Sequence, residues 1–317
     1  MVVTEILLLR HGHRLAWTLD PSTGKYTSNH PFPTRLPADP PLAAHGARQA
    51  SETSAFLHKT LFDQARNDRL RIYTSLFYRC LETLRPTVEK LRAEFTDDPK
   101  MLKSLEVRGE RGLGEWFGHA WFKQPVPGTP AMLKKKFFPW LDEHYSSRII
   151  PDSHGERIET LHTRIAKALE EVVRYVDKEF LDAGRTEEEV TLLICGHAAQ
   201  IICSGRALTG QMPEDLDEDD FQCYTCGISK FRKRTDFADG GKWNRRLGVA
   251  GGWDCVLNSE CSHLSEGEER GWHFHGDESF DSYGGASGPR TSDGGVKESH
   301  LERNEDSNET WSNTAKL

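Results

Sequence analysis

Three continuous apolar runs constrain the fold more than any other feature of this sequence. VVTEILLL covers residues 2–9, LRIYTS covers residues 70–75, and VTLLICG covers residues 190–196. Each run is short and lacks the alternation of a half-exposed strand, so each predicts a strand that is buried on both faces. Such strands are typical of a parallel sheet that is covered by helices on both sides.

The segments between these runs predict amphipathic helices and shorter strands. The predicted helices cover residues 43–61, 77–95, 153–180 and 198–208, and the further strands cover residues 101–107, 222–231 and 243–257. Strands that alternate with helices predict a three-layer α/β/α fold with a mostly parallel central sheet.

Composition divides the chain into one domain and a tail. We expect a single domain over residues 1–258, with cap insertions at about 15–41, which is rich in proline, and at 118–152, which mixes aromatic residues, prolines and a basic run. Residues 259–317 are rich in Gly, Ser, Asp and Glu and poor in aliphatic residues, so they predict a polar, largely disordered tail.

Charge and cysteine content exclude several classes of protein. The net charge of -8 gives no global reason for direct contact with nucleic acid. The start lacks a signal-peptide pattern, and no apolar run has the length of a membrane span. Seven cysteines, an odd number, fit reduced thiols. These features indicate a cytoplasmic or nuclear protein.

Charged side chains follow each of the three buried runs. Arg10 and His11 follow the first run, Arg79 stands shortly after the second, and His197 directly follows the third. In parallel sheets, ligands bind beyond the carboxyl ends of the strands, so we expect these side chains to converge there. A neutral imidazole is a competent nucleophile toward phosphorus, and arginine forks suit phosphate oxygens. The pattern therefore predicts phosphoryl transfer, with Arg14 as a further phosphate ligand.

A leaving oxygen also needs a proton, and ERGLGEW at residues 110–116 offers two carboxylic acids, Glu110 and Glu115. The cysteines of CYTC at 223–226, with Cys261 and His263, have poor spacing for zinc. A buried strand is the better interpretation of that segment. We expect neither a metal nor a cofactor, because the arginines supply the positive charge.

Several of these segments together resemble the histidine phosphatase, or phosphoglycerate-mutase-like, superfamily. The resemblance rests on RHGHR at 10–14, SLFYRCLET at 75–83 and CGHAAQI at 195–201, and it extends over residues 4 to about 235. RHGxR and ERGLGEW are similar to a branch that contains phosphotyrosine-type phosphatases. Within it, the chain most resembles a fungal group that includes the phosphatase domain of a TFIIIC subunit.

The resemblance implies a phosphoglycerate-mutase-like fold and a role for each matching residue. His11 would be the phosphorylated nucleophile, Glu110 the acid ahead of Glu115, and His197 a third catalytic group. The phosphate pocket would comprise Arg10, Arg14, Arg79 and His197. Leu76 stands where the family has proline, and Gly196 where serine is frequent.

The sequence therefore predicts a metal-independent phosphatase that hydrolyses phosphomonoesters through a phosphohistidine. Its substrate would be a phosphorylated small molecule or phosphoprotein, with aryl phosphates such as phosphotyrosine favoured by Trp116, Trp121, Phe122, Phe137 and Trp140. A mutase is disfavoured because no dedicated mutase loop is present. The alternative is a catalytically weak or idle scaffold with the phosphatase fold, which binds transcription or signalling proteins.

Overall fold

The computed structural model describes residues 2–30, 32–235, 249–275 and 290–291. Its centre is a seven-stranded sheet in the order β6-β5-β4-β7-β1-β8-β9. The strands are β1 (Val3–Arg10), β4 (Leu70–Thr74), β5 (Val107–Gly109), β6 (Leu141–Asp142), β7 (Val190–Gly196), β8 (Ile228–Lys233) and β9 (Trp253–Glu260). The first five in this order are parallel, β8 is antiparallel to β1, and β9 is antiparallel to β8. The predicted three-layer, mostly parallel α/β fold is confirmed.

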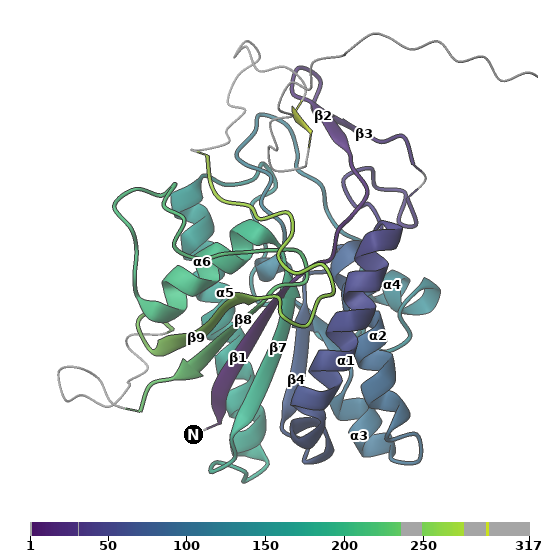
Figure 1. Ribbon diagram of the computed structural model, residues 1–317, viewed down its shortest axis with the longest axis vertical. Coiled ribbons are helices and arrows are strands. Elements are labelled where there is room, and N and C mark those ends of the chain that lie inside the picture. The colour runs from purple at the N-terminus through teal and green to yellow at the C-terminus, as the bar shows by residue number, and fades with distance from the viewer. Residues whose placement is uncertain (1, 31, 236–248, 276–289, 292–317) are drawn as a thin grey trace, which may run out of the picture.

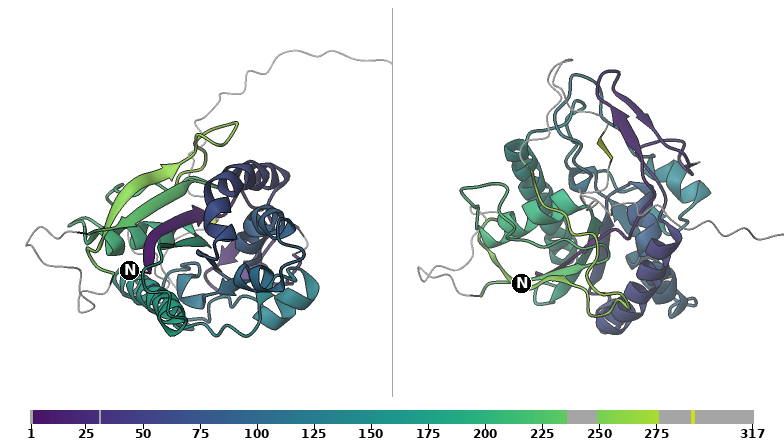
Figure 2. Two further views of the ribbon diagram at one scale, coloured as in Figure 1. Left: turned by 90° about the horizontal axis from the view of Figure 1, so that it is seen from below. Right: turned by 45° about the horizontal axis from the view of Figure 1, so that its top comes forward.

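Helices cover both faces of the sheet (Figures 1 and 2). Helices α1 (Ala44–Arg66) and α2 (Tyr78–Ala93) pack on one face, and α5 (Ile158–Asp182) and α6 (Ala198–Thr209) pack on the other. Alternate residues of β1 enter the two cores, with Ile6 on the α5 side and Leu7 on the α1 side. This two-sided burial is why the strand is continuously apolar. No helix among the described residues is long and apolar enough to cross a membrane.

The segment predicted as a strand at 101–107 is mostly helical. Helix α3 covers Pro99–Ser104, and strand β5 begins only at Val107. The Asp98 carboxylate accepts hydrogen bonds from the Lys100 and Met101 amides at 3.1 Å, and proline fits the first turn of a helix. Local capping therefore outweighs the apolar pattern. Of the predicted strand at 243–257, residues 243–248 lie outside the described residues.

Both predicted insertions carry secondary structure, and the second also supplies β6 to the central sheet. The first contains a hairpin of β2 (Thr18–Asp20) and β3 (Lys25–Thr27), and the second contains α4 (Pro130–Lys136). Strand β10 (Arg290–Thr291) adds to the hairpin by pairing with β2 (Figure 1). A piece of chain from near the C-terminus is therefore part of the cap.

Residues 261–275, here called the strap, differ from the disordered tail that composition predicts. Cys261, Leu264 and Phe274 are buried in the two cores, with Phe274 only 2% exposed. The Phe274 ring packs edge-on against Trp116, at 5.4 Å between centroids. Average composition conceals this order because a few well-spaced apolar side chains are enough to fix a segment. Apart from β10, the rest of the predicted tail lies outside the described residues.

Replacing Phe274 with alanine tests whether the strap belongs to the cooperative fold. We expect Phe274→Ala to lower the free energy of unfolding by about 3 kcal/mol, because it removes a buried ring that neighbouring residues cannot replace. Leu181→Ala is the control, since Leu181 is 56% exposed and its loss should cost less than about 0.5 kcal/mol. Urea unfolding measures both values, and equal losses in the two variants would contradict the assignment.

Candidate active site

The ends of three parallel strands bring the predicted site residues together. Strands β1 and β7 pair up to Arg10 and Gly196, and the next residue continues the ladder, because the His11 amide donates to the Gly196 carbonyl at 3.0 Å. On the other side of β7, the Ser75 amide donates to the Cys195 carbonyl at 2.9 Å. His11, Ser75 and His197 therefore leave the sheet at one edge.

Two glycines allow the turn after β1 to pack closely against helix α1. A Cβ atom at Gly46 would lie 2.0 Å from the His13 carbonyl oxygen, and one at Gly12 would lie 2.9 Å from the Gly46 carbonyl oxygen. The Gly12 amide also donates to the Thr83 hydroxyl at 3.0 Å. That hydroxyl in turn donates to the Arg79 carbonyl at 2.7 Å. The turn is thus fixed to both α1 and α2.

His11 is a buried imidazole with a defined tautomer. Its Nδ1 lies 2.8 Å from the Gly12 carbonyl oxygen, which can only accept, so Nδ1 carries the proton and Nε2 keeps its lone pair. The pKa of His11 is well below its usual value, first because of burial. Four cationic groups add to this effect: Arg79, His197, Arg10 and Arg14. The geometry therefore favours an uncharged His11 with a free nitrogen.

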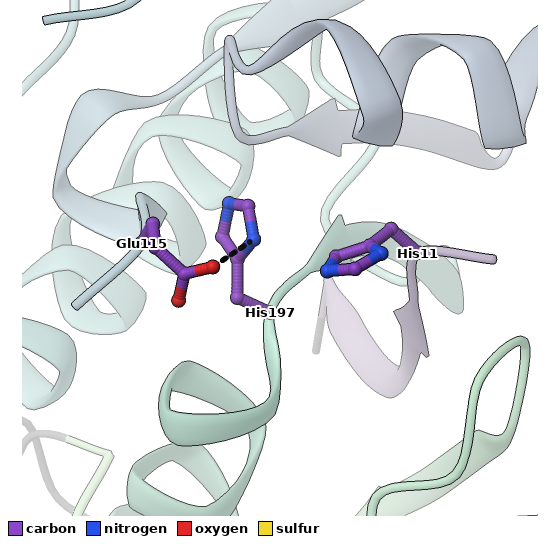
Figure 3. Close-up of side chains that lie close together, drawn as sticks. All are labelled: His11, Glu115 and His197. Atoms are coloured by element: carbon purple, nitrogen blue, oxygen red, sulfur yellow. Dashed lines mark ion pairs between the residues drawn. The ribbon is translucent and has the colours of Figure 1, made fainter. Parts of the chain in front are cut away.

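His197 lies between His11 and Glu115 (Figure 3), and both of its ring nitrogens have a partner. The two ring centroids are 5.3 Å apart in an edge-on arrangement. Nε2 of His197 is 2.8 Å from the Ser75 hydroxyl, and Nδ1 is 3.1 Å from Glu115 Oε2. Burial lowers the pKa of His197, but Cys80 and Glu115 outweigh it, so the net shift is upward. The pKa values of the two histidines are therefore shifted in opposite directions, that of His11 downward and that of His197 upward.

Arg79 is fully buried and is balanced by two carboxylates. Its guanidinium donates to Glu115 Oε2 at 2.8 Å and lies 3.6 Å from Asp39 Oδ1. Asp39 also accepts from the Tyr78 amide at 2.7 Å, at the start of α2. Burial raises the pKa of Asp39 to about 6, against the lowering effect of Arg79. Asp39 comes from the first insertion, so the cap helps to hold a residue of the site.

The other two predicted phosphate ligands flank His11. The Arg10 guanidinium donates to the carbonyls of Cys223 and Arg270, the latter in the strap. Arg14 donates to the Leu15 carbonyl at 3.1 Å, and its guanidinium lies 5.7 Å from the centre of the Trp17 ring. The structure therefore brings Arg10, Arg14 and Arg79 to the surroundings of His11.

Glu110, expected as the acid, occupies a different environment from the two histidines. Its carboxylate is fully buried and accepts four hydrogen bonds of 2.8–3.2 Å: from the Tyr145 hydroxyl and from the amides of Gly112, Arg148 and Ile149. These partners belong to the segments that follow β5 and β6 rather than to the ends of β1 and β7. Glu110 therefore anchors the loop on which Glu115 stands, and its role as the acid stays a prediction.

Glu115 is the carboxylate that lies with the histidines. Burial raises its pKa, but His197, Arg79 and His11 more than offset this and hold the pKa well below its usual value. Glu115 is therefore ionised in the free site, where its carboxylate lies against the same cations that a phosphate would use. Glu110 and Glu115 stand five residues apart in the sequence. What separates them is that Glu110 directly follows a strand and caps the 3-10 turn Arg111–Leu113.

Three ligand-type side chains could be considered for a metal. His11, Glu115 and His197 place ligand atoms within 4.8 Å of one another, and within the described ranges no other His, Cys, Asp or Glu group of three does so. The Arg79 guanidinium is bonded to the same Glu115 oxygen, and two more arginines lower the pKa of His11. This positive charge opposes a divalent cation and suits a tetrahedral dianion.

Sequence reasoning missed three side chains that support the site. Asp39, Ser75 and Thr83 fix Arg79, His197 and the Gly12 turn respectively. Ser75 and Thr83 stand in the motif SLFYRCLET, where their regular spacing around Arg79 was the available signal. Asp39 lies among prolines in an irregular segment, and no pattern in the sequence marks it.

The chain is similar to one curated protein and to several solved structures. It is 29% identical over 289 residues to the "Transcription factor tau 55 kDa subunit" of Saccharomyces cerevisiae. The alignment covers 86% of this chain and 59% of that protein. The chain thus spans less than two thirds of that relative.

Among solved structures, an ecdysone phosphate phosphatase from Bombix mori is 19% identical, with a TM-score of 0.49 over 77% of this chain and 99% of that one. A phosphoserine phosphatase from Entamoeba histolytica is 18% identical, with a TM-score of 0.44 over 83% and 100%.

A family model fits most of the domain. Its match covers residues 6–246, from within β1 to beyond β8, and so includes all three strand ends that carry the site. This match agrees with the motifs at the strand ends and with the parallel sheet that brings them together. The chain belongs to the histidine phosphatase superfamily, branch 1.

Proposed function

We propose that this protein is a phosphatase that hydrolyses phosphomonoesters, without a metal ion, through a phosphohistidine on His11. One observation carries the proposal: the buried His11 imidazole is bonded through Nδ1 to the Gly12 carbonyl, and burial and four cationic groups around it lower its pKa and so favour the neutral ring. Membership of the histidine phosphatase superfamily supports the same reaction.

The reaction would begin with attack on phosphorus by Nε2 of His11. A bond forms between this nitrogen and phosphorus while the bond from phosphorus to the leaving oxygen breaks. The Gly12 carbonyl keeps Nδ1 protonated and so stabilises the positive charge that develops on the ring. Arg10, Arg14, Arg79 and protonated His197 would bind the phosphoryl oxygens, which carry the charge during transfer.

We propose Glu115, in place of Glu110, as the acid that protonates the leaving oxygen. In the free site Glu115 is ionised because Arg79 and His197 are its partners. A phosphate dianion that takes over these two cations would remove that stabilisation and add negative charge nearby. Both effects raise the pKa of Glu115, so the bound substrate itself would favour the protonated acid. In the second step, the same carboxylate would accept a proton from the water that hydrolyses the phosphohistidine.

Aryl phosphates are the proposed substrate class. Phe77 and Phe117 lie beside the site, with their ring centroids 5.6 Å apart, and the Phe77 ring also lies 5.6 Å from that of His197. Not every aromatic residue of the second insertion supports this preference. Phe137 and Trp140 pack into the core around α2 and α4, away from the strand ends.

A second candidate function is a scaffold in a transcription complex, with a nuclear location and protein partners. It is supported by the alignment with a transcription factor subunit, which extends over 86% of this chain at 29% identity. Both functions are compatible with the same fold, and activity measurements separate them.

Replacing His11 tests covalent catalysis. Wild-type protein should release phosphate from p-nitrophenyl phosphate in EDTA, and His11→Ala should lose at least about 10³-fold in kcat because it removes the nucleophile. His58→Ala, in the middle of α1, is the matched control and should retain its activity. Absence of phosphate release by the wild type would instead favour the scaffold.

Glutamine at each glutamate distinguishes the two acids. Glu115→Gln should lower kcat for phenyl phosphate by about 10²–10⁴-fold, and far less for p-nitrophenyl phosphate, whose leaving group needs no proton. Glu110→Gln should instead lower the free energy of unfolding by about 1–3 kcal/mol, because one buried acceptor is lost, with kcat per folded molecule near wild type. A leaving-group dependence confined to Glu110→Gln would restore Glu110 as the acid.

The opposite pKa shifts of the two histidines predict a broad pH optimum. Because the pKa of His11 is lowered, His11 stays neutral well below pH 6.5, and because that of His197 is raised, His197 stays protonated above pH 6.5. The profile of kcat/KM for p-nitrophenyl phosphate should therefore be flat around pH 6.5. In Glu115→Gln the alkaline limb should move to lower pH, because Glu115 raises the pKa of His197. An unmoved alkaline limb would contradict this assignment.

A further inference from the structure

A pocket adjoins the site at Glu115 and Ser75, and neither histidine lines it. Figure 3 shows Glu115 on the opposite side of His197 from His11. In an in-line displacement the nucleophile, the phosphorus and the leaving oxygen are nearly collinear. The leaving group must therefore lie on the side of the phosphate away from His11, next to the acid. A pocket that Glu115 lines and His11 does not is in the right position for it.

The walls of this pocket are largely apolar. Leu76, Phe77, Trp116 and Phe117 come from the segments that carry Ser75 and Glu115. The opposite wall comes from the second insertion, where Val126 is 57% exposed and Ile150 is 55% exposed. Large apolar side chains exposed at the rim of a concave site are typical of a surface that an apolar group covers on binding.

The cations that line the pocket differ in their partners. Arg164 is paired with Glu156 at 2.7 Å and also donates to the Gly112 carbonyl. The charge of Arg164 is therefore already neutralised by a carboxylate of the protein. Arg111 has no hydrogen-bond or ion-pair partner for its guanidinium anywhere in the described part of the chain, and its Nε atom is buried. The remaining acid, Asp152, has a side chain that is 67% exposed and accepts from the His154 amide. A guanidinium without a partner in an apolar pocket favours an anionic ligand group.

We propose that this pocket binds the leaving group, and that Arg111 selects aryl leaving groups that carry a carboxylate. The apolar walls cover the ring, and the guanidinium pairs with the acidic substituent. This inference rests on the proposed phosphatase function and names the substrate class of the same site. Arg111 acts here as a specificity residue, because it contacts the part of the substrate that does not react.

Matched substrates isolate the contribution of Arg111. The kcat/KM values for phenyl phosphate and for 3- and 4-carboxyphenyl phosphate are measured with wild type, Arg111→Met and Arg111→Lys. Methionine keeps the apolar stem of the side chain without its charge. The ratio of carboxyphenyl to phenyl phosphate should fall about tenfold in Arg111→Met for the better of the two isomers, and lysine should restore part of it. Differences in leaving-group acidity cancel because the same substrates are compared across variants.

Lys136→Met is the control for net charge. Lys136 is exposed at the end of α4 and does not line the pocket, so both the rates and the ratio should stay near wild type. An unchanged ratio in Arg111→Met would overturn the role of Arg111 while leaving the phosphatase function intact. If the ratio fell equally in Lys136→Met, the effect would come from net charge at long range rather than from a contact with Arg111. That result would also overturn the proposed role of Arg111. If wild type hydrolysed none of the aryl phosphates, the proposed function would fail instead.

Discussion

The buried charge of Arg79 is the interaction on which the rest of the site depends. A guanidinium with no exposed surface is stable only when acidic groups surround it, and here they come from two separate parts of the chain. Asp39 lies in the first insertion, and Glu115 lies on the loop after β5. One buried cation therefore joins the cap, helix α2 and the acid. Removing either carboxylate would leave Arg79 partly uncompensated, so the cap is a part of the site rather than a cover over it.

Much of the fold, and the meeting of the charged side chains at one edge of the sheet, could be predicted from the sequence. Strands buried on both faces leave an unmistakable apolar run, and parallel pairing forces their carboxyl ends to one edge. Arg10, His11 and His197 needed no further information, because they directly follow such runs. Arg79 required only the inference that a helix begins a few residues after its strand.

The placement of the acidic side chains around the site depends on features that a sequence does not display. Whether Glu110 or Glu115 reaches the histidines is decided by a short 3-10 turn and by four hydrogen bonds that hold Glu110 in its own loop. Asp39 acts across a distance of 40 residues in an irregular segment. The strap is likewise ordered by single buried side chains such as Phe274. The average composition of the segment does not reveal such side chains.

The contact between Arg10 and the strap has a consequence for how the protein is synthesised. The Arg10 guanidinium donates to the carbonyl of Arg270, which lies 260 residues later in the chain. A nascent chain that already contains every strand of the central sheet still lacks this acceptor. The first residue of the site to leave the ribosome thus waits for a late segment of the domain, and a chain that ends before the strap would keep the Cys223 carbonyl but lack the second carbonyl that accepts from the Arg10 guanidinium.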